Sequence, residues 1–178
     1  MTGNARSAGL LKTNQTICYD TGGFVVTCSG TGQDGELLKG TARSYTDNND
    51  GTITDNSTGL VWQKCSAGLS GTNCEIGSAV TVTWANALTY CNANTDALPG
   101  SGWRLPNIYE LYSLVDFGVA SVPFTNVTYF PTFASSSNYW SSTSRPASST
   151  SAMYVGFSSG NASGGFNKIT SCYFRCVR

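Results

Sequence analysis

Histidine is absent from this chain of 178 residues, and charged side chains make up only 11% of it. Catalysis by a Ser-His-Asp or Cys-His set is excluded, because both need an imidazole as the base. A zinc site is not expected, since Cys-x-x-Cys pairs are also missing. No glycine-rich phosphate-binding motif is present. We therefore predict no catalytic residues, no metal site and no cofactor, and expect that the chain is not an enzyme.

The last third of the chain also lacks carboxylates, because all ten Asp and Glu residues lie between Asp20 and Asp116. Residues 1–116 hold six basic and ten acidic residues, hence −4, and residues 117–178 hold four basic residues, hence +4. Such a surface favours anionic ligands, although in a charge-poor chain the imbalance can equally arise by chance. Four charges without a basic run are too few for nucleic acid, so no nucleic-acid partner is predicted.

No hydrophobic run is long enough to cross a membrane. The N-terminal sequence MTGNARSAGLLK lacks the apolar stretch of a signal peptide. Hydrophobic residues still make up 40% and aromatic residues 12%, enough for a packed core and more than disordered chains contain. With abundant Gly, Ser, Thr and Asn, this composition favours a loop-rich, largely β protein that is extracellular, on the cell surface or virion-associated.

Seven cysteines indicate disulfides and therefore an oxidising compartment. They are Cys18, Cys28, Cys65, Cys74, Cys91, Cys172 and Cys176. Cys18 and Cys28 are predicted to staple one local loop. Cys65 and Cys74 are predicted to staple another. Because the count is odd, at least one thiol stays unpaired or is open to an intermolecular bond.

A hairpin is predicted at Asp50-Gly51, which lies between β-favouring residues and is followed by a strand ending at Trp62. The polar residues of this turn also allow a calcium loop as the alternative, and they are Asp47, Asn49, Asp50 and Asp55. Their spacing misses the EF-hand pattern by one residue, so the turn interpretation is preferred. A structural calcium near Asp47–Asp55 is left open.

Two helices are predicted in the middle of the chain. Residues 81–94 carry a buried stripe at helical spacing, made of Trp84, Ala87, Leu88 and Cys91. Residues 103–116 carry a second stripe, made of Ile108, Leu111, Leu114 and Val115. Asn107 is predicted to cap the second helix, while Glu110 reaches back toward it.

After residue 117 only short β-like segments remain, NYWSS, MYVGF, GGFNK and CYFRCV. The predicted fold is therefore α+β, with two helices, short antiparallel strands and long ordered loops. Residues 1–40 are predicted to form an irregular N-terminal extension and residues 41–178 one domain. The tryptophans are expected in the core with hydrogen-bonded indole N–H groups, a sugar-stacking tryptophan being the alternative. They are Trp62, Trp84, Trp103 and Trp140.

Five segments in order resemble one family: TDNNDGTITDNSTGLVWQK, TWANALTYCN, WRLPNIYELYSLVD, YWSSTS and FRCVR. The family is named for the C-terminal domain of the Legionella collagen-like protein, and the resemblance covers roughly residues 40–178. It implies a C-type-lectin-like fold of the formylglycine-generating-enzyme type, and a surface adhesin or receptor that is monomeric or trimeric. It also implies a core disulfide between Cys91 and Cys176, which leaves Cys172 as the odd thiol.

A subset of such domains are variable proteins of diversity-generating retroelements, in which adenine-directed mutagenesis rewrites chosen codons. Rewritten Asn codons reach Ser, Gly, Tyr, Phe, Cys, Thr, Ala or Asp, and the tail from Gly156 to Cys172 fits that repertoire. The same residue types dominate antibody paratopes. The predicted recognition surface, with Phe166 exposed, is Asn138, Gly156, Ser158, Gly164, Gly165, Phe166, Asn167, Ser171 and Cys172.

The predicted function is thus the binding of a protein or glycan on another cell or surface. Because carboxylates are missing from the tail, this binding is expected not to need calcium. The first alternative is a fixed-specificity adhesin for anionic polysaccharide, and a purely structural role is another. A remote alternative is a cysteine-dependent oxidase, since Cys172 and Cys176 are four positions apart and superficially resemble the closely spaced cysteine pair of the formylglycine-generating enzyme.

Overall fold

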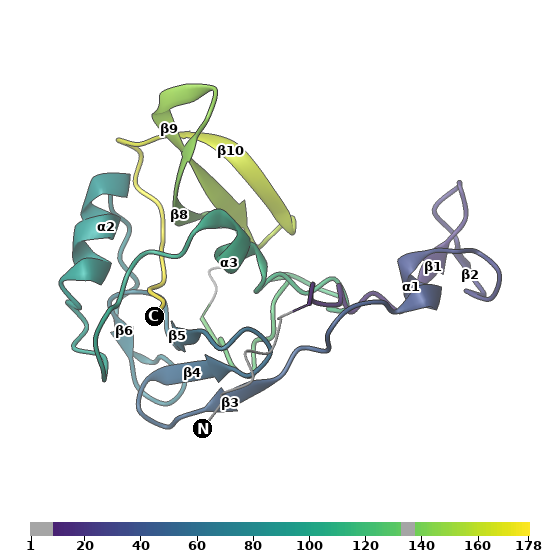
Figure 1. Ribbon diagram of the computed structural model, residues 1–178, viewed down its shortest axis with the longest axis horizontal. Helices are drawn as coiled ribbons and strands as arrows, with labels where there is room; N and C mark the ends of the chain where they lie inside the picture. The colour runs from purple at the N-terminus through teal and green to yellow at the C-terminus, as the bar shows by residue number, and fades with distance from the viewer. Residues whose placement is uncertain (1–8, 133–137) are drawn as a thin grey trace, which may run out of the picture.

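The computed structural model describes residues 9–132 and 138–178, drawn in colour in Figure 1. These residues contain three helices and ten short strands, and the named strands pair only in antiparallel fashion, in four small sheets. The prediction of a mixed α and β domain with short antiparallel strands is confirmed. The expected number of two helices is wrong, because a single-turn helix lies near the N-terminus. No helix within the described residues has the length and apolar character to cross a membrane.

The N-terminal segment forms a small unit that lies apart from the body of the molecule in Figure 1. It contains β1 (Cys18–Tyr19), β2 (Val25–Val26) and α1 (Asp34–Leu37), and a disulfide joins Cys18 to Cys28. Gly35 of α1 approaches the disulfide so closely that a Cβ there would lie 2.9 Å from the Cys18 Sγ. The sequence predicted irregular structure here, because strands of two residues and a one-turn helix are too short to show periodicity.

The first sheet of the body has the order β3–β4–β5. Its strands are β3 (Tyr45–Asp47), β4 (Thr52–Asp55) and β5 (Val61–Gln63). Asn49 and Gly51 adopt positive φ angles of 57° and 86° in the β3–β4 turn, which Asn and Gly tolerate best. The hairpin predicted from Asp50-Gly51 is confirmed. A second small sheet pairs β6 (Leu69–Ser70) with β7 (Ile76–Gly77). Strand β6 lies inside the loop that the Cys65–Cys74 disulfide closes, and β7 follows directly after that loop.

Both helices predicted in the middle of the chain are present. Helix α2 (Trp84–Asn92) buries Ala87 and Cys91, and a disulfide joins Cys91 to Cys176. Helix α3 (Ile108–Tyr112) begins at the predicted capping box. The Asn107 side chain accepts hydrogen bonds from the backbone of Tyr109 and Glu110, and Glu110 accepts one from the Asn107 backbone at 2.8 Å.

Glu110 also forms a two-point ion pair with Arg104, with both N–O distances 2.7 Å. The hydrogen bond from Arg104 is the largest cause that holds the pKa of Glu110 below its ordinary value. We expect Glu110→Gln to lower the free energy of unfolding by about 1 kcal/mol at neutral pH. A carboxylate with a lowered pKa in the folded state stabilises above its ordinary pKa of 4.5, and the benefit disappears as the pH falls through the lowered pKa. Urea unfolding at a series of acidic pH values should show that the free energies of unfolding of the wild type and the Glu110→Gln protein converge as the pH falls. A difference that stays constant with pH would contradict this expectation.

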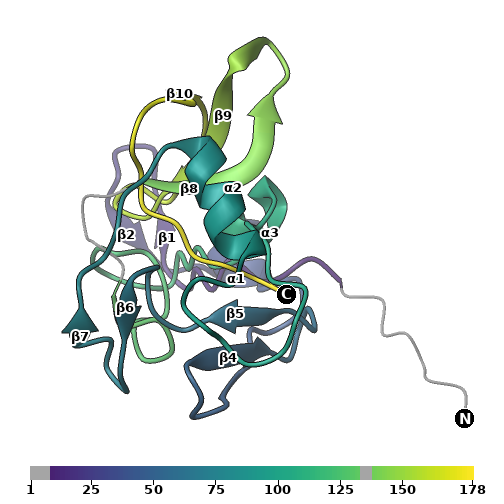
Figure 2. The same ribbon diagram turned by 90° about the vertical axis from the view of Figure 1, so that its left-hand side faces the viewer.

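The C-terminal sheet has the order β10–β9–β8 and is the largest. Its strands are β8 (Asn138–Arg145), β9 (Ser148–Gly156) and β10 (Asn161–Asn167). The predicted segment CYFRCV is not a regular strand. It makes single bridges instead, among them Cys172 to Val82 and Val177 to both Trp62 and Arg104. Figure 2 shows this last segment running beside α2 toward β5.

The interior contains two hydrophobic clusters. One centres on Trp62, Leu111 and Tyr139. The other centres on Trp103, Trp140 and the Cys91–Cys176 disulfide. Three of the four tryptophans are buried as predicted, whereas Trp84 is half-buried. The indoles of Trp84, Trp103 and Trp140 donate to backbone carbonyls, but the buried Nε1 of Trp62 has no partner within the described residues, contrary to the prediction.

Candidate functional site

The predicted recognition residues lie on and beside the C-terminal sheet, and they differ in exposure. Gly165, Asn167 and Ser171 are exposed. Half-buried are Asn138, Ser158, Gly164 and Phe166. Gly156 and Cys172, which were also predicted as contact residues, are buried.

Phe166 is not the exposed side chain that the sequence suggested. Its ring centroid lies 4.4 Å from that of Tyr154 and 6.3 Å from that of Trp140, edge-on to the indole. Rings at these distances attract one another through their quadrupoles as well as through burial. The β10 register shifts between Gly164 and Phe166. Such a bulge reorients the strand locally, and nothing in the codon-rewriting pattern that suggested an exposed Phe166 could indicate it.

A hollow of about 180 Å³ brings four of the predicted residues together. Asn138 begins β8, Phe166 lies near the end of β10, and Ser171 and Cys172 follow in the chain beyond β10. Sequence reasoning missed the other lining residues, which are Thr81, Thr170 and Tyr173. Thr81 lies far in the sequence from the other lining residues. Its position just before α2 was the only feature of the sequence that set it apart. The hollow is lined by hydroxyl and amide side chains and by two aromatic residues, Phe166 and Tyr173.

Cys172, which lines this hollow, is a free thiol that is only 5% exposed. Burial raises the pKa of the Cys172 thiol to about 11, from an ordinary value of 9.0. Because the thiolate is the reactive form, its population at pH 8 falls roughly a hundredfold. Burial and the raised pKa both disfavour an intermolecular disulfide at Cys172 in the folded chain. Cys176 is bonded to Cys91, so Cys172 and Cys176 do not form a dithiol pair.

We therefore expect Cys172 to react with Ellman's reagent at pH 8 at least roughly a hundredfold more slowly than glutathione does. In denaturant the same thiol should react at the rate of an ordinary exposed cysteine. The measurement is the absorbance change with time for the native and the unfolded protein. A native thiol that reacts as fast as glutathione would show that reagents reach Cys172 in the folded chain.

Two basic side chains flank the sheet where carboxylates are absent. Arg145 is exposed at the end of β8. The Lys168 Nζ lies 4.2 Å above the Trp84 ring and donates to the Ser144 hydroxyl at 2.8 Å. Lys168 thus covers one face of the half-buried Trp84 indole, and that face is not free to stack on a sugar. The surface is polar with a basic margin.

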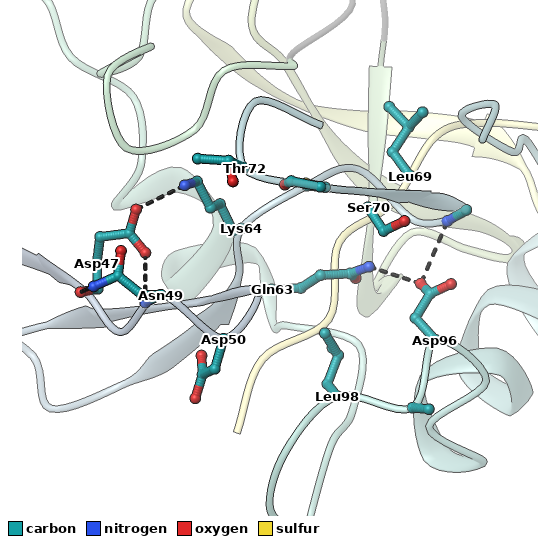
Figure 3. A pocket seen from close by; sticks show the side chains of 15 residues that line it. Asp47, Asn49, Asp50, Gln63, Lys64, Leu69, Ser70, Thr72, Asp96 and Leu98 are labelled. Carbon is teal, nitrogen blue, oxygen red and sulfur yellow. Dashed lines mark hydrogen bonds and ion pairs between the residues drawn. The ribbon is translucent and has the colours of Figure 1, made fainter. Parts of the chain in front are cut away.

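A second and larger hollow, of about 500 Å³, opens at the other end of the body, where Figure 3 shows it. Its walls are the β3–β4 turn, β5, the loop that carries β6, and residues 96–98. The sequence predicted no binding site here. The only signal was the polar cluster of the hairpin, which the turn interpretation accounts for.

The hairpin carboxylates do act as turn acceptors in the structure. Asp47 accepts a hydrogen bond from the Asn49 backbone at 2.9 Å, Asp50 from the Thr52 backbone at 3.0 Å, and Asp55 from the Ser57 backbone at 2.9 Å. Within the residues that the structure describes, no group of three His, Cys, Asp or Glu side chains is arranged to hold a metal ion.

Comparison with known families identifies one match. The model of the Lcl C-terminal domain matches residues 51–178, more than half of the chain. The chain belongs to the Lcl C-terminal domain family. A comparison with curated proteins found no significant match. The matched range of the Lcl C-terminal domain contains the whole C-terminal sheet, the smaller hollow, and two of the three disulfides.

Family membership points to a surface or binding domain, and the three disulfides are consistent with an extracellular or surface protein. The first of those disulfides, Cys18–Cys28, lies before the matched range of the Lcl C-terminal domain.

Proposed function

We propose that this Lcl C-terminal domain is an extracellular or cell-surface binding domain with a C-type-lectin-like fold. It recognises a protein or glycan on another cell or surface and has no catalytic role. The observation that carries the proposal is the smaller hollow, which gathers Asn138, Phe166 and Ser171 from separate parts of the chain. We name the hollow together with the exposed Gly165 and Asn167 the C-terminal face.

The composition of the C-terminal face suits recognition of a large ligand. An aromatic ring held by its neighbours supplies contact area at low entropic cost, and small polar side chains adapt their hydrogen bonds to the partner. Phe166 is fixed by Tyr154 and Trp140, while Asn167 and Ser171 are exposed beside it. Phe166 is thus a rigid apolar anchor surrounded by adaptable polar side chains. Protein interfaces have the same arrangement, with an apolar centre and a polar rim.

A variable surface, as in diversity-generating retroelement proteins, requires positions that accept many side chains. The nearest atoms to a Cβ added at Gly164 or Gly165 belong to the Arg145 side chain. They would lie 3.7 Å from the Cβ at Gly164 and 3.6 Å from the Cβ at Gly165, which are ordinary van der Waals contacts. At Gly156 it would lie 3.1 Å from the Asn138 Oδ1 and 3.3 Å from the Ser159 Oγ. We propose that variation is confined to the open positions and does not include Gly156 or Cys172.

We expect Gly165→Tyr to change the free energy of unfolding by less than about 0.5 kcal/mol, as surface substitutions usually do. Gly156→Tyr should destabilise by about 2 kcal/mol or more, because it forces a large side chain into a filled site. Urea unfolding of the two variants measures the contrast. Equal losses of unfolding free energy in the two variants would show that Gly165 does not accept large side chains better than Gly156 does. Sequencing this locus in many cells of the source population would then show whether these codons differ between individuals.

Binding itself is tested by probing a glycan array with the labelled domain, with and without EDTA. We expect signals that survive EDTA, because the C-terminal face has no carboxylate. Asn167→Ala combined with Ser171→Arg should abolish them while the unfolding curve stays unchanged, since both side chains are exposed. A control variant at an exposed residue of α2, Asn86→Ala, should bind normally. Signals that persist in the double variant on glycans without an ammonium group would contradict a site on the C-terminal face.

A fixed-specificity adhesin for anionic polysaccharide is the second candidate, supported by Arg145 and Lys168 at the margin of the C-terminal sheet. It predicts retention on immobilised heparin that falls steeply with salt, because exposed charges are screened over about 10 Å at 0.1 M. Arg145→Ala should then weaken retention. Binding that depends little on salt favours the first candidate.

A further inference from the structure

The larger hollow is built as a binding site of its own, separate from the C-terminal face. We propose that it binds a small ligand that carries an ammonium group on a hydroxylated body, the chemical class of amino sugars. Its volume of about 500 Å³ lies in the range of small-molecule sites. The proposal does not depend on the function proposed for the C-terminal face, since the two hollows share no lining residue.

The walls of the larger hollow are held in place before any ligand arrives. Asp96 accepts hydrogen bonds from the Gln63 side chain at 2.7 Å, the Tyr90 hydroxyl at 2.8 Å and the Gly68 backbone at 3.3 Å. Gln63 is only 1% exposed. The loop that carries Leu69 and Ser70 is closed by the Cys65–Cys74 disulfide. A site held in this way loses little conformational entropy on binding.

The charge of the lining favours a cation. Asp47, Asp50 and Asp96 contribute three negative charges and Lys64 one positive charge, which leaves −2. Figure 3 shows Asp47 and Asp50 on one side of Gln63 and Asp96 on the other. All lining residues belong to the described part of the chain, and Lys64 is the single basic side chain among them.

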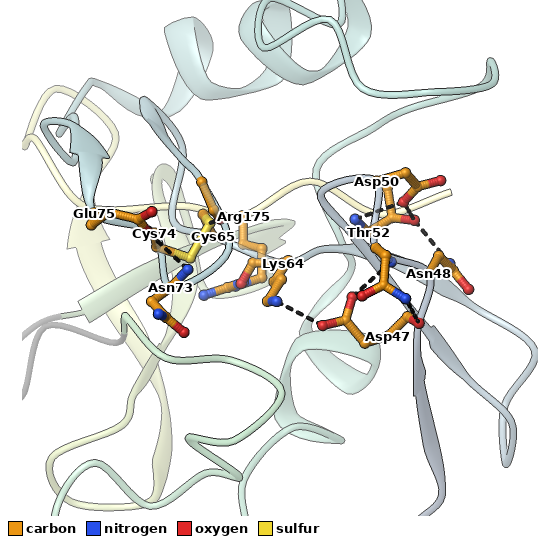
Figure 4. Close-up of polar contacts among 12 residues, drawn as sticks. Asp47, Asn48, Asp50, Thr52, Lys64, Cys65, Asn73, Cys74, Glu75 and Arg175 are labelled. Atoms are coloured by element: carbon orange, nitrogen blue, oxygen red, sulfur yellow. Dashed lines mark hydrogen bonds and ion pairs between the residues drawn. A yellow bond between two sulfur atoms is a disulfide. The ribbon is translucent and has the colours of Figure 1, made fainter.

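Lys64 does not neutralise the whole site, because it is bound to one carboxylate. Its Nζ lies 2.7 Å from the Asp47 Oδ2, and its side chain is 8% exposed. Burial acts against ionised Asp47, but the hydrogen bonds from Lys64 and the Asn49 backbone outweigh it and lower the pKa of Asp47. Figure 4 shows this ion pair between the hairpin and the Cys65–Cys74 disulfide. The charges of Asp50 and Asp96 therefore remain for the ligand.

The remaining groups suit an organic cation better than a metal ion. Leu69 and Leu98 supply apolar surface for the C–H groups of a ring, and Ser70 and Thr72 supply hydroxyls. A metal ion would have to displace carboxylates from their turn hydrogen bonds and lie near the Lys64 ammonium. An ammonium donates hydrogen bonds to one or two carboxylates and leaves those turns intact.

Titration of the ¹⁵N-labelled full chain with glucosamine, N-acetylglucosamine and glucose tests the proposal by NMR. These probes share one ring and differ in whether position 2 carries an ammonium, an amide or a hydroxyl. We expect glucosamine to shift the backbone signals of Gly51, Ser70 and Leu98 and to bind about two- to fivefold more tightly than glucose, the range of an exposed ion pair. High salt should remove the difference.

Asp50→Asn should remove most of that preference, because the amide oxygen can still accept from Thr52 while the charge is lost. Asp20→Asn is the matched control: an exposed aspartate in the N-terminal unit whose oxygen likewise accepts turn hydrogen bonds. Equal binding of the three sugars, shifts elsewhere only, or an Asp50→Asn protein that keeps the preference would each overturn the proposal. Loss of array signals in the Asn167 and Ser171 variant would leave this result untouched.

Discussion

Replacing Cys91 and Cys176 together by alanine is expected to lower the free energy of unfolding by about 4 to 5 kcal/mol. The disulfide joins residues 85 positions apart, and the entropy that a cross-link removes from the unfolded chain grows with the length of the loop it closes. Both cysteines are also buried in the cluster around Trp140, so their removal leaves unfilled space. For a domain of ordinary stability this is a large part of the total.

The matched control is Cys65→Ala with Cys74→Ala, whose disulfide spans only nine positions. The same relation gives about 2.5 kcal/mol for this pair. Urea unfolding of both double variants, with the midpoint and slope fitted separately, measures the two losses. If the short loop costs as much as the long one, the stabilisation comes from local packing rather than from restriction of the unfolded chain.

The second large effect is expected from Arg175→Met, which should destabilise by about 3 kcal/mol. Arg175 is fully buried, and its Nη1 donates to the backbone carbonyl of Gln63 at 2.6 Å and to that of Lys64. Its guanidinium also lies 5.1 Å from the centroid of the Phe130 ring. Methionine fills similar space but donates nothing, so two buried carbonyls lose a charged donor.

Burial works in the opposite direction, because it disfavours the charged guanidinium and lowers the pKa of Arg175 to about 10. Removing a buried charge is therefore partly favourable, and the net loss reports whether the carbonyl contacts outweigh desolvation. Arg178→Met is the control, since Arg178 is exposed and lies 5.5 Å from the Trp103 ring centroid. It should cost less than about 1 kcal/mol. An Arg175→Met protein as stable as the wild type would show that the contacts only offset the desolvation.

Local features of this chain were predictable from sequence because their partners are near in the chain. The capping box at Asn107 and Glu110 spans three positions, and the β3–β4 turn depends on residues that tolerate positive φ. By contrast, the N-terminal β1, β2 and α1 were too short to give a periodic signal. The terminal segment looked like a strand but makes only single bridges to four different parts of the chain.

The sequence predicted which stretch of the chain carries the recognition residues, but not which of these residues are exposed. Composition located the C-terminal tail, yet it gave no exposure for Gly156, Phe166 or Cys172, because exposure depends on which strands and rings pack against them. The β10 bulge after Gly164 is one such feature, and the close approach of Asn138 to Gly156 is another.

The mixed class, the hairpin, both longer helices and the family of residues 51–178 followed from the amino-acid sequence alone. Long-range packing alone brings Gln63 to Asp96 across 33 positions, encloses Arg175 and forms the larger and the smaller hollow. The difference lies in how far apart in the sequence the interacting residues are. Turns and caps are set by backbone angles and neighbours within one turn, whereas a cavity is the space left when distant segments have packed, and no single segment encodes it.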